Sequence, residues 1–107
     1  MALKLQKYLN PCGIEVEEGY FEIYELIYNL DYNNLGVRGR IYLSKEARDG
    51  GFRPIDSFET VIELDKAPEG NLVEFAYNHI LEIASKGLEY IQENCPLYKG
   101  FIGAEVI

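Results

Sequence analysis

YFEIYELIYNLDYNNLG, residues 20–36, is the stretch that decides the fold of this chain. Tyrosines stand at every fourth position from Tyr20 to Tyr32, and Tyr, Phe and Ile dominate the segment. A step of four also suits one face of a helix, but aromatic and β-branched residues favour a pleated surface, so the composition favours a strand. The turn-forming residues 33–36 predict that the chain then reverses into a hairpin.

A strand over residues 20–32 places all four tyrosines on one face of a sheet, because successive side chains point to opposite faces. The other face carries Phe21, Ile23 and Ile27, so both faces are apolar near the middle. This pattern predicts a central strand that a helix covers on one side. Part of the tyrosine set is therefore expected in the core, and the rest is suited to contact with other proteins.

The remaining apolar patterns predict an α+β fold, in which one long helix packs on one face of an antiparallel sheet of three to four strands. Asn71 is a good N-cap for that helix, while Gly87 within it indicates a kink or close packing. Gly39, in the middle of a strand, indicates a bulge or a close approach by a neighbour. The expected strands are about 14–17, 20–32, 37–43 and 58–64, and the expected helix is about 72–94.

A length of 107 residues corresponds to a single domain over residues 1–107. Residues 1–13 are expected to form an N-terminal arm. Residues 96–107 are too apolar to stay in water, and this C-terminal tail is expected to dock on the core, add an edge strand or anchor in a partner. The polar connection 44–57 has room for one helical turn, and its length is typical of loops that contact a partner.

The chain is acidic, with 18 Asp and Glu against 10 Lys and Arg and a formal charge of −8. This balance argues against nucleic acid and against an anionic membrane surface as partners. Glutamates crowd residues 15–25, while half of the positive charge lies within residues 38–53. Two interpretations stay open: the opposite charges pair within the hairpin, or the acidic face of one copy meets the basic face of the next.

The residue types that carry catalysis or bind metals are sparse, so neither an enzyme nor a cofactor or metal site is expected. The sequence shows no signal peptide, so the chain is expected in the reducing cytoplasm, where free thiols are the default. Cys12 and Cys95 are therefore expected to be free, although a disulfide between them is geometrically possible. His79, the single histidine, has no paired nucleophile and is expected to be structural. Glu63 and Asp65 could hold a cation, but solvated carboxylates explain them better.

Four features occur in order along most of the chain: an aromatic strand led by glycine over residues 19–32, the segments IYLS (41–44) and EAR (46–48), the Ala76-Tyr77 pair, and AEV at 104–106. In this order the chain resembles small proteins from the tail and virion-assembly modules of tailed bacteriophages and prophages. The resemblance implies a non-enzymatic, multi-copy subunit of a tail or baseplate, assembled in the host cytoplasm with copies of itself and other virion proteins. It carries no catalytic signature.

Two alternatives to a tail or baseplate subunit remain open. One is another virion part, such as a head–tail connector or a capsid decoration protein. The other is a small cytoplasmic regulator or inhibitor that binds one host protein with its acidic face. The residues expected at an interface come from the tyrosine strand, the basic segment and the tail: Tyr20, Tyr24, Tyr28, Tyr32, Arg38, Arg40, Tyr42, Arg48, Arg53, Phe101 and Ile102.

Overall fold

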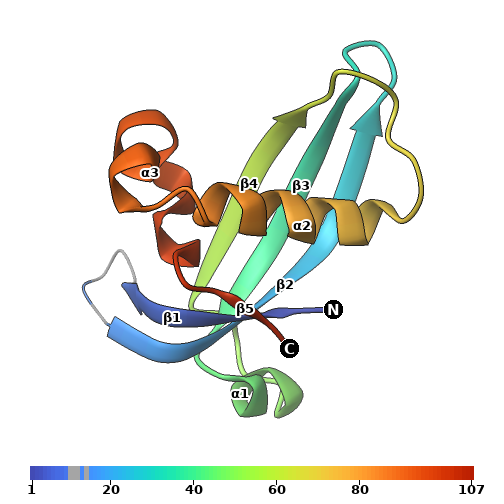
Figure 1. Cartoon of the computed structure of the whole chain (residues 1–107). Helices are drawn as coiled ribbons and strands as arrows, with labels where there is room; N and C mark the ends of the chain where they lie inside the picture. The colour runs from blue at the N-terminus through green and yellow to red at the C-terminus, as the bar shows by residue number, and fades with distance from the viewer. Residues whose placement is uncertain (10–12, 14) are drawn as a thin grey trace.

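The computed structural model describes residues 1–9, 13 and 15–107 and shows an α+β fold with a five-stranded antiparallel sheet (Figure 1). Across the sheet the strands follow the order β4-β3-β2-β1-β5. The strands are β1 (Leu3–Leu9), β2 (Glu15–Asn29), β3 (Asn34–Tyr42), β4 (Asp56–Glu63) and β5 (Glu105–Val106). The helices are α1 (Lys45–Asp49), α2 (Leu72–Ala84), α3 (Leu88–Asn94) and the 3₁₀ helix η1 (Pro96–Phe101).

One face of the sheet is covered, with α2 crossing β2, β3 and β4 (Figure 1). The core between the layers centres on Phe21 of β2, whose ring meets three others edge-on. The ring centroids lie 4.8 Å from Phe101, 5.9 Å from Phe58 and 6.1 Å from Tyr77. On the opposite face, α1 contacts one end of β2 and β3, where its Arg48 donates to Glu22. Among the described residues no helix covers the rest of this face of β2, β3 and β4, which stays open.

β2 contains a bulge at Tyr24 that changes which side chains face the helix. Ile23 pairs with Gly39, and Glu25 pairs with the adjacent residue Arg38. Tyr24 is therefore the extra residue in β2. One inserted residue inverts the alternation of side chains. Phe21 and Ile23 therefore pack into the core before the bulge, and Leu26 and Tyr28 pack into it afterwards.

The predicted tyrosine ladder on one face is therefore wrong. Tyr20 lies on the open face and Tyr28 on the covered face, because the bulge at Tyr24 separates them. Tyr32 lies beyond the end of the strand, in the turn that leads to β3. The hairpin itself, with antiparallel pairing of β2 and β3, is as expected.

The observed strands differ from the predicted ones in two respects. The segments 15–17 and 20–29 belong to one continuous strand, β2, in which Gly19 pairs with Leu5; Ile14 lies outside the described residues. Residues 3–9, expected within an arm, form β1 and pair antiparallel with β2. β1 fully buries Leu3 and Leu5, which explains why this segment docks on the sheet.

The single long helix predicted over residues 72–94 is divided into α2 and α3. Gly87, with φ +92°, precedes α3 and cannot continue a right-handed helix in this conformation. The N-terminus of the predicted helix is confirmed, because the Asn71 side chain accepts hydrogen bonds from Val73 N (2.9 Å) and Glu74 N (3.1 Å).

The C-terminal segment closes the fold next to β1. η1 buries Tyr98 and Phe101, and β5 pairs with β1 at the edge of the sheet, where Val106 lies opposite Leu3. The amide of Ile107 donates to the carbonyl oxygen of Ala2 (3.0 Å), so the two ends of the chain lie side by side (Figure 1).

Candidate functional site

The open face of β2, β3 and β4, called the outer face from here on, is organised in cross-strand rows. At one end the rows are charged, in the middle one row is apolar, and at the hairpin end the residues are polar. This division follows from the register of the three strands. From β2 to β4 the rows are Glu22–Arg40–Ser57, Glu25–Arg38–Glu59, Ile27–Gly36–Val61 and Asn29–Asn34–Glu63.

Arg38 stands at the centre of the charged rows and contacts a carboxylate on each side. Its Nη1 lies 3.2 Å from Glu25 Oε1, and its Nε lies 3.5 Å from Glu59 Oε1. Glu25 Oε1 is buried yet makes no hydrogen bond, so the first contact is an ion pair without good hydrogen-bond direction. The three side chains are about half exposed, so each pair contributes little stability, up to about 1 kcal/mol.

The other arginines of this region are also engaged within the chain. The guanidinium carbon of Arg40 lies 3.9 Å from the ring centroid of Tyr24, in cation–π geometry. Arg48 of α1 donates to Glu22 Oε2 (3.2 Å) and to Asp49 Oδ1 (3.3 Å), and Glu22 in turn raises the pKa of Arg48. Arg38 and Arg48 therefore support the interpretation that charges pair within the chain.

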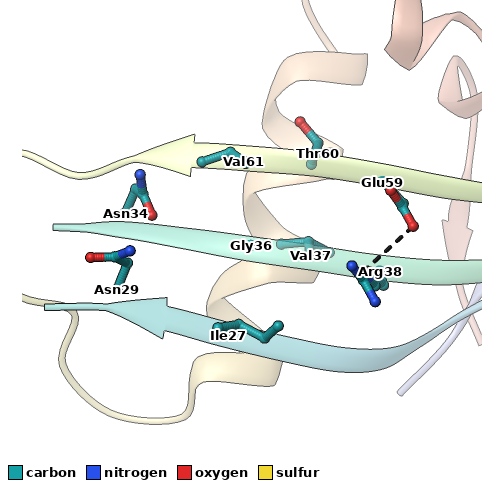
Figure 2. A pocket seen from close by; sticks show the side chains of 9 residues that line it. All are labelled: Ile27, Asn29, Asn34, Gly36, Val37, Arg38, Glu59, Thr60 and Val61. Atoms are coloured by element: carbon teal, nitrogen blue, oxygen red, sulfur yellow. Dashed lines mark ion pairs between the residues drawn. The ribbon is translucent and has the colours of Figure 1, made fainter. Parts of the chain in front are cut away.

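The apolar row encloses a hollow of about 440 Å³ in the outer face (Figure 2). Ile27 and Val61 flank Gly36, which has no side chain to fill the space between them. Figure 2 shows the hollow from outside, with Arg38 and Glu59 at one end and Asn29 and Asn34 at the other. The arrangement is an apolar hollow with polar ends on a sheet surface.

Further apolar side chains extend from this hollow to the hairpin tip. Ile27 and Val61 are 54% and 57% exposed, while Leu30 and Tyr32 in the adjoining turn are 81% and 76% exposed. The Asn29 side chain holds the turn by accepting from the backbone amides of residues 31 and 32 (3.0 and 3.1 Å). The exposed apolar groups at this end of the sheet are therefore presented by ordered backbone.

Several residues expected at an interface are occupied in the interior. Phe101 is buried at the centre of the core, and Ile102 packs against the same cluster. Tyr42 is buried beside Tyr20, at a ring-centroid distance of 6.4 Å. Burial is also the main reason for the raised pKa of Tyr20. Tyr28 is half-buried on the covered face, so these side chains are largely withdrawn from the surface.

The surviving candidates divide into two groups. Tyr24, Arg38 and Arg40 lie on the outer face, and Tyr32 lies at the adjoining tip. Arg48 and Arg53 are exposed on the connection between β3 and β4, away from the apolar row. The structure thus brings together only part of the expected set.

Ile27, Val61 and Leu30 were absent from the expected set. For Ile27 the reason is that the predicted strand carried no bulge. The sequence gives no clear signal of the bulge, because Phe21, Ile23 and Ile27 continue one odd-numbered apolar face. Only the structure shows that core packing changes from Phe21 and Ile23 to Leu26 after the bulge. Once this change is recognised, Ile27 must point away from the core.

A second hollow, of about 490 Å³, lies between α2 and the connection from β4 to α2. His79 lines it, stacked on Phe75 with a ring-centroid distance of 6.5 Å. Burial lowers the pKa of His79, with Glu82 opposing this effect. Glu63 and Asp65 also line the hollow. It combines a half-buried imidazole with the acidic connection that lines the hollow.

Three further features of the described part of the chain bear on site chemistry. No three His, Cys, Asp or Glu side chains there come together in a way that would hold a metal ion. None of its helices has the length and apolar composition of a membrane-spanning segment. Cys95 is a free thiol, and Cys12 lies outside the described residues.

No protein-family model matches this chain, and comparison with the curated proteins and with the solved structures likewise finds no match.

Proposed function

We propose that this protein is a non-enzymatic structural subunit that assembles with copies of itself and with other proteins through the outer face. From the resemblance of its sequence, we propose that the assembly is the tail or baseplate of a tailed bacteriophage. The single observation that supports assembly through this face is the exposed apolar row Ile27–Gly36–Val61 with the adjoining hairpin tip.

Exposed apolar surface of this kind supports a binding role. Isolated apolar residues on a surface are ordinary, but a contiguous patch on a monomer typically marks an interaction site. Here four large apolar side chains occupy one end of the sheet, next to a hollow that a side chain of a partner can enter. Burial of such surface contributes roughly 25 cal/mol per Å², which favours association.

The charges beside the patch suit orientation more than affinity. Arg38 already contacts Glu25 and Glu59, so a partner that used it would replace existing pairs. Four carboxylates on the outer face stand against two guanidinium groups, which leaves the surface acidic. We therefore propose that subunits join through the apolar row, while the charged rows fix their orientation.

The position of β4 adds a second means of contact. β4 lies at the edge of the sheet, with β3 on one side only, and its pairing with β3 runs without a bulge. An edge strand offers backbone donors and acceptors to another strand. A subunit that contacts its neighbours along this edge extends the sheet from one copy to the next.

The tail or baseplate assignment is tested by co-expression of the chain with the proteins encoded next to it. A stable complex with a neighbouring structural protein, lost when Ile27 and Val61 are both changed to Asp, is the expected result. Capture of one host protein in place of any neighbouring product would contradict the assignment and favour a regulator or inhibitor.

A further inference from the structure

The hollow beside His79 has the properties of a small-molecule site. Its volume of about 490 Å³ lies within the usual range for ligand pockets. Ile62 and Phe75 pack with the smaller of the two core clusters and supply apolar walls. His79 adds the edge of an imidazole, and burial lowers its pKa, so that it is neutral at pH 7. The interior of the hollow is therefore apolar and uncharged.

The connection that forms the lip of the hollow is anchored at both ends. At its start, Leu64 N donates to the carbonyl oxygen of Asn33 (3.2 Å), and Asn33 Nδ2 donates to the carbonyl oxygen of Leu64 (3.0 Å). At its end, Asn71 caps α2 through two backbone amides. Asn33 is itself fixed by the hydroxyl of Tyr28, which donates to its Oδ1 (2.7 Å). The hollow is thus largely formed before any ligand arrives, which reduces the entropic cost of binding.

The charges around the hollow select the sign of a ligand. Two exposed acidic residues of the connection, Asp65 and Glu69, line it together with the single Lys66. Phe75 presents an aromatic ring beside them, stacked on His79. Carboxylates attract cations directly, and the face of an aromatic ring attracts them through its quadrupole. An apolar interior with an acidic lip matches a molecule that has an apolar body and a positive end.

We propose that this hollow binds a small organic cation, an alkyl or aryl ammonium whose apolar body packs against Ile62 and Phe75 and whose charge meets Asp65 and Glu69. This function is independent of assembly through the outer face. The site requires no covalent step and no metal.

The test uses three small probes that share one apolar body: phenethylamine, phenethyl alcohol and phenylacetate. His79 is the single histidine of the chain, so its ring protons in ¹H NMR report on the site without overlap from other histidines. We expect phenethylamine to shift these resonances saturably, phenethyl alcohol to bind more weakly, and phenylacetate to bind least. Equal responses to all three probes, or no shift with phenethylamine, would overturn the proposal.

Two variants distinguish the effect of the acidic lip on binding from the general effect of removing surface charge. In Asp65→Asn with Glu69→Gln the hollow keeps its shape, and we expect the affinity for phenethylamine to fall by about two- to fivefold for each exposed carboxylate removed. Glu89→Gln on α3 removes an exposed carboxylate that does not line the hollow and should leave the affinity unchanged. Binding by the double variant as tight as that of the unchanged protein would overturn the role of the lip. Circular dichroism checks that each variant is folded.

Discussion

The backbone N–H of Ile23 donates a hydrogen bond of 2.7 Å to the hydroxyl of Tyr77. Ile23 stands directly before the bulge residue Tyr24 in β2, and Tyr77 lies on α2. A bulge disrupts the hydrogen-bond ladder locally, and a buried backbone donor needs a partner. The helix supplies that partner, so the docking of α2 and the bulge in β2 stabilise each other.

Removal of this hydroxyl tests the coupling between helix and bulge. In Tyr77→Phe the ring still fills the core, but the N–H of Ile23 loses its acceptor. We expect the free energy of unfolding to fall by about 1–3 kcal/mol, as for other buried donors left without a partner. Urea denaturation followed by circular dichroism measures it.

The matched control is Tyr98→Phe, which removes another hydroxyl from a buried tyrosine. Tyr98 Oη hydrogen-bonds with the side-chain oxygen of Thr60, at 3.3 Å, and among the described residues no backbone N–H is shown to donate to it. We expect a smaller loss than for Tyr77→Phe. Equal losses in the two variants would show that the hydrogen bond to Ile23 contributes no more to the free energy of unfolding than the contact between Tyr98 and Thr60.

Two glycines of β3 test the packing of the two faces. A Cβ at Gly39 would overlap the ring of Phe21 on the covered face, whereas a Cβ at Gly36 on the outer face would meet only Ile27, at 3.6 Å or more. We expect Gly39→Ala to lower the free energy of unfolding by about 1–3 kcal/mol, as overpacking of a core does. Gly36→Ala should be neutral within about 0.5 kcal/mol. Thermal unfolding of both variants measures the contrast, and the reverse order would contradict the assignment of faces.

The sequence predicted much of the sheet, because strand patterns are local. Residues 37–43 and 58–64 alternate cleanly, and both lie largely within strands of the structure. The close approach expected at Gly39 is confirmed, since the ring of Phe21 occupies the space of its missing side chain. The bulge at Tyr24 was missed, because the fourfold spacing of tyrosines suggested an unbroken alternation, whereas buried apolar residues change phase there.

The helical half was predicted less completely, because its breaks depend on backbone conformation and tertiary contacts. The apolar spacing continues through Gly87, yet the positive φ of this residue separates α2 from α3. Residues 3–9 lack a strong strand signal, and they become a strand because β2 offers an edge on which Leu3 and Leu5 are buried. Phe101 was expected at an interface since the tail is apolar, but its ring packs in the core against Phe21 and Phe58.

The environment of His79 predicts a dependence of stability on acid pH. Burial lowers its pKa below the ordinary value of 6.5, so between the two values the unfolded chain binds a proton that the folded chain does not. The free energy of unfolding therefore decreases as the pH falls through this range. The charges around it are Glu82 on its own helix and Glu63, Asp65, Lys66 and Glu69 around the hollow.

Direct titration of the His79 ring by ¹H NMR should give a pKa below 6.5. In addition, the stability of the unchanged protein relative to His79→Gln should decrease between about pH 7.5 and pH 5.5, because the carboxylates are common to both. A pKa at or above the ordinary value would contradict the burial of this side chain.

Assembly through the outer face is tested by size-exclusion chromatography with light scattering at high protein concentration. Two single variants give a matched comparison: Ile27→Asp on the outer face and Leu97→Asp on η1, at residues that are both 54% exposed. We predict that the unchanged protein and Leu97→Asp have a mass that is a multiple of the chain mass, while Ile27→Asp is shifted towards the monomer. A strictly monomeric unchanged protein, or an assembly that Ile27→Asp leaves intact, would show that the subunits do not join through this face.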